Sequence, residues 1–273
     1  MAIITVSREL AALGDETARE LAKMPGYRFV DKSALEERMI SYGIESSKFR
    51  KYDERKPSFL AALSQDRDDY LHYLKSAMYA EAGQGNCVFM GRGAAMVFKN
   101  MPGHISMFLA APPEIRVERV KSYFHCDEKR ARQIIERSDS DRTGFHRYFF
   151  DIEWKDPGNY HICLNTGIFH PASCAEIVNK LKAQIFTETA EAENAARLKE
   201  LVLEQRIKQR IMYEKEVPVH FLEISVSGDI VTLYGVVNSQ ALADTAVNMA
   251  RETAGEATVR SEIQIVREYS VMP

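Results

Sequence analysis

The apolar positions of the first two thirds of the chain form short strand-like runs separated by stretches of helical periodicity. Ile3, Ile4 and Val6 make a β-branched run typical of a buried parallel strand. Four later runs have the same character: 27–30, 87–90, 105–110 and 161–165. Apolar residues at helical spacing predict helices from Glu16 and Ser33, at 66–82, 113–124 and 128–138, and from Ala172. Strands alternating with helices predict an α/β fold with a doubly wound parallel sheet.

Two stretches interrupt this alternation. Residues 43–65 are polar and irregular, which indicates a mobile insertion or a helical flap over the site. Residues 145–150 are aromatic and basic and follow the predicted helix at 128–138, for which Asp127 is a plausible N-cap.

The pattern changes near residue 186. Residues 187–200 are rich in Ala and Glu and are predicted to be helical. Apolar alternation over 221–236, centred on Ser227-Gly228-Asp229, indicates a β-hairpin. A helix at 239–253 and a strand at 257–266 complete a small α+β unit of order α-β-β-α-β. We therefore expect domains at 1–185 and 195–273, joined by a helical linker at 186–194.

Composition narrows the functional classes. With 273 residues, 45% of them hydrophobic, and a net charge of −3, the chain is predicted to be a soluble globular protein without nonspecific affinity for nucleic acid. It has neither a signal-peptide pattern nor an apolar run long enough to span a bilayer, so we expect a cytoplasmic protein. The four cysteines are scattered and the histidines share no ligand spacing, which favours buried thiols and no structural metal: Cys87, Cys126, Cys163 and Cys174.

The connection from the first strand to the first helix lies where nucleotide-binding α/β domains place a phosphate loop. It contains a single glycine, Gly14, and Asp15 follows where a cation is expected. The side chains of Ala11, Ala12 and Leu13 restrict positive φ and close backbone approach. We therefore expect a weakened phosphate grip. Asp15 then either caps the helix or belongs to a donor site that uses Arg8 or a carboxylate-held magnesium.

Two further residues lie at the carboxyl ends of predicted strands, where open α/β sheets bind ligands. Arg92 stands between two glycines, and its guanidinium suits a monophosphate held by two hydrogen bonds. The alternative is a salt bridge across the crevice to a residue such as Asp31. Asp31 is itself a candidate for a ribose or base contact, or a helix cap.

Residues 1–185 resemble the cytidylate kinase-like family. The carrying motifs are Val6-Ser7-Arg8-Glu9, Tyr27-x-Phe29-x-Asp31-Lys32, Gly91-Arg92-Gly93, and Trp154-x-Asp156-Pro157-x-x-Tyr160 leading to Leu164-Asn165-Thr166. The resemblance implies a P-loop kinase fold that transfers a phosphoryl group from ATP, with Mg²⁺, to a nucleoside monophosphate. It also implies an arginine-bearing lid, for which Arg137 and Arg142 are the candidate catalytic residues.

The second half, about 195–268, is similar to a BON domain. The resemblance rests on the apolar alternation from Ile224 through Val237 with glycines at 228 and 235, followed by Ala246-x-x-x-Ala250. It implies attachment to a phospholipid or protein ligand.

Three functions compete at this point. The first is a nucleoside monophosphate kinase that uses ATP and Mg²⁺. The second is a weakened relative that binds a nucleotide or another phosphorylated small molecule through Arg8, Gly14, Asp31 and Arg92. The third is a non-catalytic ligand-sensing or scaffold protein that acts through its BON-like domain, and a homo-oligomer is open in each case.

Overall fold

A computed structural model describes residues 1–44 and 66–266. The predicted insertion at 43–65 lies almost entirely outside these residues. The chain divides into two compact units, Met1–Ala195 and Ala196–Pro273. No helix among the described residues combines the length and the apolar character that a membrane span requires.

The first unit is built on a five-stranded sheet whose strands all run parallel, in the order β2-β3-β1-β4-β5. The strands are β1 (Ile3–Arg8), β2 (Arg28–Val30), β3 (Cys87–Met90), β4 (His104–Ala110) and β5 (Ile162–Asn165). The central strands are buried on both faces, as their continuous apolar sequences predict. The predicted doubly wound parallel sheet is confirmed.

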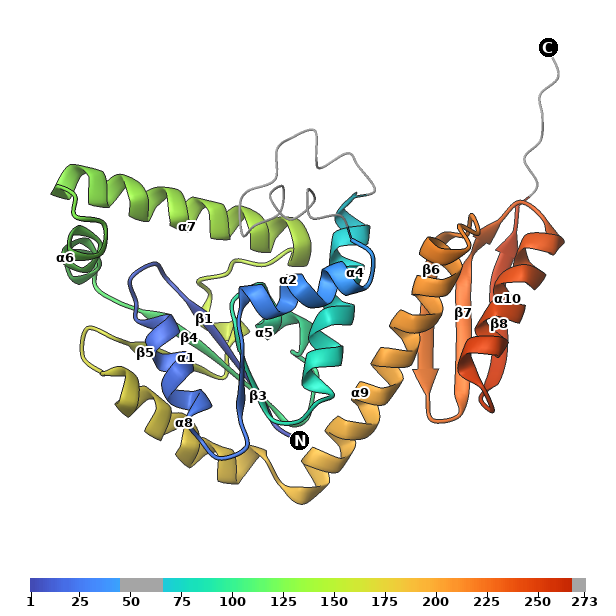
Figure 1. Cartoon of the computed structure of the whole chain (residues 1–273), viewed down its shortest axis with the longest axis horizontal. Coiled ribbons are helices and arrows are strands. Elements are labelled where there is room, and N and C mark those ends of the chain that lie inside the picture. The colour runs from blue at the N-terminus through green and yellow to red at the C-terminus, as the bar shows by residue number, and fades with distance from the viewer. Residues whose placement is uncertain (45–65, 267–273) are drawn as a thin grey trace, which may run out of the picture. The chain divides into compact units, whose positions relative to one another are not determined.

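Helices cover both faces of this sheet (Figure 1). The helices of this part of the chain are α1 (Gly14–Ala22), α2 (Lys32–Ser41), α4 (Asp66–Ala82), α5 (Ala94–Val97), α6 (Pro113–Phe124), α7 (Glu128–Phe150) and α8 (Pro171–Ile185), and α9 (Glu188–Gln209) follows and extends past the unit boundary at Ala195. On one face, Ile4 and Val6 pack in a core with Leu21 of α1 and Val178 of α8. α2, α4 and α5 lie on the other face.

The long helix α7 differs from the prediction. Asp127 is its N-cap, as expected, and accepts a hydrogen bond from the Arg130 N–H at 2.7 Å. The helix does not end near residue 138, however, but continues through the aromatic stretch to Phe150. Phe145 and Phe149 are buried on its inner side, so tertiary packing extends a segment whose local sequence gave no clear helical period.

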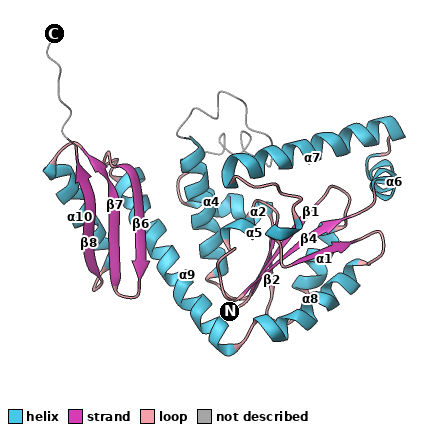
Figure 2. Cartoon of the chain, turned by 180° about the vertical axis from the view of Figure 1, so that it is seen from behind, coloured by secondary structure: helices cyan, strands magenta, loops and turns pink. Residues whose placement is uncertain are grey.

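The second unit holds a three-stranded sheet of order β6-β7-β8 with α10 (Gln240–Ala254) along β8 (Figure 2). The strands are β6 (His220–Ser227), β7 (Ile230–Val237) and β8 (Thr258–Ile265), and a short π-helix (Arg210–Glu214) precedes them. β6 and β7 form the predicted antiparallel hairpin, and Gly228 at its turn has the positive φ of 56° that favours glycine. β8 is parallel to β7. A separate core includes Leu233 and Ala246.

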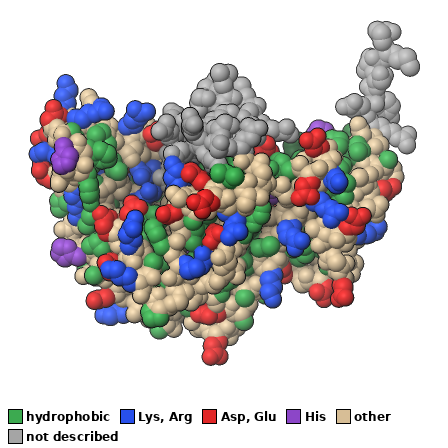
Figure 3. All heavy atoms as spheres, in the orientation of Figure 1, with side chains coloured by type: hydrophobic (Ala, Val, Ile, Leu, Met, Phe, Trp, Pro, Cys, Tyr) green, Lys and Arg blue, Asp and Glu red, His purple; other side chains and the backbone are tan. Residues whose placement is uncertain are grey.

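The described part of the face shown in Figure 3 has no large patch of side chains of a single charge. Lys and Arg side chains there lie interspersed with Asp and Glu side chains, as the net charge of −3 predicts. All four cysteines are free. Cys87 and Cys174 are buried as expected, whereas Cys126 is half-buried and Cys163 is exposed.

Candidate functional site

The connection from β1 to α1 adopts a conformation that its sequence disfavours. Ala11 and Leu13 have φ values of 61° and 53°, in the left-handed region that non-glycine residues rarely enter. Two of the three residues expected to disfavour positive φ therefore adopt it, and Ala12 between them does not. The β1–α1 loop keeps a tightly curled path without the glycines that would make such a path easy.

Helix α1 begins at Gly14, and Leu13 is its N-cap without a side-chain hydrogen bond. Asp15 consequently lies in the first turn and does not cap the helix, contrary to one of the two alternatives above. The Thr17 N–H donates to the Leu13 carbonyl at 3.0 Å and closes the first turn. The N–H groups before Thr17 have no carbonyl within the helix, so this end favours an anion.

Gly14 is required by packing rather than by its φ angle. A Cβ atom there would lie 2.5 Å from Cγ of Arg8 and 2.8 Å from Cε of Met90. Any side chain at this position would displace the aliphatic stem of Arg8. Gly14 therefore leaves the space that the aliphatic stem of Arg8 occupies beside the start of α1.

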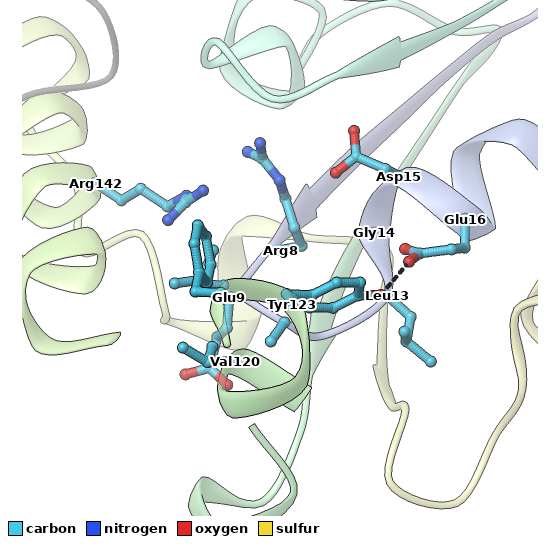
Figure 4. A pocket seen from close by; sticks show the side chains of 12 residues that line it. Arg8, Glu9, Leu13, Gly14, Asp15, Glu16, Val120, Tyr123 and Arg142 are labelled. Atoms are coloured by element: carbon cyan, nitrogen blue, oxygen red, sulfur yellow. Dashed lines mark hydrogen bonds between the residues drawn. The ribbon is translucent and has the colours of Figure 1, made fainter. Parts of the chain in front are cut away.

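The loop, the first turn of α1 and parts of α6 and α7 enclose a cavity of about 360 Å³ (Figure 4). Arg8 from β1 and Arg142 from α7 both line it, so two sequence-predicted residues from distant segments share one site. The Tyr123 hydroxyl donates to the Glu16 carboxylate at 2.7 Å, and both residues belong to the lining. The full lining is Arg8, Glu9, Leu10, Ala11, Leu13, Gly14, Asp15, Glu16, Val120, Tyr123, Phe124 and Arg142.

Two arginines of α6 hold the outer side of the loop. Arg116 Nε donates to the Leu10 carbonyl at 2.8 Å, and an Arg119 terminal nitrogen donates to the Ala11 carbonyl at 2.9 Å. Arg119 also donates to the Thr166 carbonyl at 2.7 Å. These bonds help to offset the backbone strain at Ala11 because they satisfy carbonyls that the curled path turns outward.

A four-membered ion cluster ties the loop to α7. Arg116 binds both carboxylate oxygens of Asp139 at 2.7 and 3.0 Å, and Lys155 bridges Asp139 and Glu9 at 2.8 and 2.6 Å. Arg116 also lies 3.2 Å from Glu9. Burial alone would raise the pKa of Asp139, but the hydrogen bonds from Arg116 and Lys155 outweigh it and hold that pKa below its ordinary value.

Arg92 and Asp31 lie at the carboxyl ends of β3 and β2. Arg92 has a φ of 55° and is 4% exposed, and its guanidinium donates to the Tyr70 hydroxyl at 3.1 Å and to the Glu36 carboxylate at 3.0 Å. The salt-bridge alternative is therefore present, with Glu36 rather than Asp31 as its partner. Asp31 caps α2 and accepts from the Ala34 N–H at 3.0 Å.

The two lid candidates are placed differently on α7. Arg142 is half-buried, donates to the Ser138 hydroxyl and lines the cavity. Arg137 is exposed and lies outside the cavity lining.

Arg116, Arg119 and Tyr123 were not identified from the sequence. A signal was present, because Arg116 and Arg119 are three residues apart on the predicted helix at 113–124 and therefore share a face. Which carbonyls they would meet depends on the path of the β1–α1 loop, and only the tertiary structure gives that path.

The residues at the start of α1 do not fit a magnesium-bound triphosphate. A phosphate loop ends in Gly-Lys-Ser or Gly-Lys-Thr, whose lysine and hydroxyl meet the phosphates and the metal. Here Gly14 is followed by two exposed carboxylates, Asp15 and Glu16. No group of three His, Cys, Asp or Glu side chains within the described ranges is arranged to hold a metal ion.

Comparison with protein families gives two matches. Residues 3–168 match the model of the cytidylate kinase-like family. Residues 199–267 match the model of the BON domain.

Individual relatives match more weakly. A cytidylate kinase from Sulfolobus acidocaldarius is 31% identical over 96 residues, which are 35% of this chain and 52% of that protein. The chain thus spans about half the length of this curated relative. The crystal structure of an uncharacterized protein from Eubacterium ventriosum has a TM-score of 0.53 and 20% identity, covers 67% of this chain and 99% of its own, and shows the fold alone. A shikimate kinase from Bacteroides thetaiotaomicron is more distant, with a TM-score of 0.39, 14% identity and coverage of 68% and 99%.

Proposed function

The chain belongs to the cytidylate kinase-like family, and from this premise we propose that its first unit binds a nucleotide or another phosphorylated small molecule but transfers phosphate from ATP poorly. One observation carries the proposal. Arg8, Arg142 and the start of α1 converge on one cavity, while Asp15 and Glu16 occupy the positions of the phosphate-loop lysine and hydroxyl.

The balance of charge decides what this cavity holds. Two guanidinium groups and the dipole of α1 favour an anionic group. A carboxylate about 4 Å from a phosphate oxygen costs about 1 kcal/mol in water and about 4 kcal/mol at an effective dielectric of 20. A triphosphate, whose phosphates would have to reach the first turn of α1, therefore loses more than a monophosphate held by the arginines alone.

Arg92 and Asp31 are the candidates for binding the nucleoside monophosphate that would accept the phosphoryl group. The relative named cytidylate kinase favours a nucleoside monophosphate as the ligand of the family fold. Arg92 is already bound to Glu36 and Tyr70, so a monophosphate has to replace Glu36 to reach its guanidinium. This exchange adds a further cost to catalysis.

An Asp15→Lys variant tests the weakened grip. Removing the carboxylate and adding a cation should raise the affinity for ATP with Mg²⁺ about tenfold or more, since each 1.4 kcal/mol is a factor of ten. Isothermal titration of wild type and variant measures this, with turnover of CMP and dCMP in a coupled assay. Efficient wild-type turnover, or a loss of ATP affinity in the variant, would contradict the proposal.

Arg142→Ala tests the cavity itself. Loss of a charge-assisted hydrogen bond of about 1.5–3 kcal/mol should weaken binding of a nucleotide about tenfold or more. Arg130→Ala is the matched control, because Arg130 is an exposed arginine of the same helix and does not line the cavity. Turnover of an Arg137→Ala variant tests the proposed catalytic role of Arg137.

A second candidate function is a ligand-sensing protein without catalysis that acts through its BON domain. It is favoured by Arg116 and Arg119, two cations beside the loop that are committed to its carbonyls and to Asp139 rather than directed at a phosphate. A complete absence of turnover in the presence of bound nucleotide, in place of the slow turnover expected of a weakened kinase, would support this candidate, and so would the absence of any effect of Asp15→Lys on the coupled assay.

A further inference from the structure

Strand β8 forms one edge of the small sheet in the second unit. It pairs with β7 over eight successive residues, Thr258–Ile265, without a register shift. Within the part of the chain that the structure describes, no strand pairs with its outer side. A regular edge strand of this length presents a row of N–H and C=O groups that can pair with another strand.

Helix α10 leaves the inner face of β8 partly uncovered. A cavity of about 540 Å³ lies between them, lined on the strand by Ser261, Ile263 and Ile265 and on the helix by Ala243 and Val247. Ile265 is 41% exposed although it lies on the side of the sheet that faces the core. The edge therefore offers apolar surface together with backbone groups that β7 does not pair, of which the Ile263 N–H donates weakly to the Ser261 hydroxyl at 3.4 Å.

We propose that this edge pairs with β8 of a second copy of the chain, antiparallel, about a two-fold axis at Ser261. The sequence of β8 is complementary to itself in this register. Arg260 lies opposite Glu262 of the second copy, Val259 opposite Ile263, and Thr258 opposite Gln264, each pair occurring twice. Opposite charges and apolar pairs directly across an antiparallel ladder are the stabilising combinations.

The facing surface of α10 carries a second charge match. Asp244 and Arg251 both line the cavity and are seven residues apart, which places them on one side of the helix. A two-fold axis reverses the helix direction, so Asp244 of one copy approaches Arg251 of the other. The same two-fold axis thus brings opposite charges together both on β8 and on α10.

The opposite edge of the sheet, β6, also exposes an apolar side chain, Phe221, but it is neither regular nor complementary to itself. β6 has a register shift between His220 and Glu223, and such bulges twist an edge away from further pairing. Among its side chains only Glu223 carries a full charge, so it has no oppositely charged pair to match across a two-fold axis. The proposal therefore concerns β8 alone.

A disulfide across the axis tests the register in the full chain. Residues directly opposite in an antiparallel pair have Cα atoms about 4.5–5.5 Å apart, within the range of a disulfide. Ser261→Cys should therefore form a covalent dimer under mild oxidation. Gln264→Cys is the matched control: it is exposed on the same strand but lies about 20 Å from its counterpart. Both variants carry Cys163→Ser, because Cys163 is exposed.

Charge reversal tests the same interface without a covalent bond. Glu262→Arg places like charges opposite at two points and should raise the dimer dissociation constant about tenfold or more in sedimentation velocity. The double variant R260E/E262R restores complementarity and should recover the wild-type constant within about threefold. A monomeric wild type, a dimer insensitive to Glu262→Arg, or equal cross-linking of Ser261→Cys and Gln264→Cys would each overturn the proposal.

Discussion

Ala11 and Leu13 show how single residues are held against their own preference. Each adopts a positive φ in the β1–α1 loop, and for a residue with a Cβ this costs about 1–2 kcal/mol. The hydrogen bonds from Arg116 and Arg119 to the Leu10 and Ala11 carbonyls are the compensation that the structure provides. Strain of this kind is concentrated at functional sites.

Relief of this strain is measurable. Ala11→Gly should raise the free energy of unfolding by about 0.5–1 kcal/mol, because the relieved φ cost exceeds the added entropy of the unfolded chain. Ala12→Gly is the control: Ala12 is buried and has no positive φ, so glycine there should lower stability by a similar amount. Urea denaturation compares the two, and equal effects of both substitutions would argue against strain at Ala11.

At the level of elements, α7 is the helix that the ion cluster fixes to the loop. Arg116 on α6 is 4% exposed and is bound by both oxygens of Asp139. Lys155, in the segment that follows α7, completes the cluster through Asp139 and Glu9. The cluster thus joins the β1–α1 loop, two helices and a connecting segment.

Asp139→Asn should destabilise the first unit by about 1–3 kcal/mol, since Arg116 then keeps a buried charge with a weaker partner. The pKa of Asp139 lies below its ordinary value, so its carboxylate stabilises the fold above about pH 4 and loses this effect as the pH falls through the folded-state pKa. In urea titrations between pH 5 and pH 3, the free energy of unfolding should therefore fall less steeply with decreasing pH in the variant than in the wild type. Glu128→Gln, an exposed partner of Arg132 on the same helix, should change little. An identical response of the two variants would contradict this role for Asp139.

At the scale of the whole molecule, the chain joins two units with separate cores, and α9 runs from Glu188 to Gln209 across the boundary between them. Each core is closed within its own unit, so each has its own source of stability. The proposed nucleotide site belongs to the first unit and the proposed β8 interface to the second.

Calorimetry of the full chain should therefore resolve two transitions. A nucleotide at about 100 times its dissociation constant should stabilise only the first unit, by about 2.7 kcal/mol. Leu233→Ala removes a fully buried side chain of the second core. It should lower the free energy of unfolding of the second unit alone, by about 2–5 kcal/mol. One cooperative transition that responds to both changes would show that the units are energetically coupled.

The sequence by itself determined the alternation of strands and helices along the chain, except for the short helix α5, together with the hairpin at Gly228 and the family, because hydrophobic periodicity and turn residues are local signals. It also identified Arg8, Gly14 and Arg142, which the fold brings to one cavity. Only the tertiary structure decided that α7 continues to Phe150, that Glu36 is the partner of Arg92, and that Ala11 and Leu13 accept positive φ. These features depend on contacts between segments far apart in the chain, whose combined free energy overrides local preference.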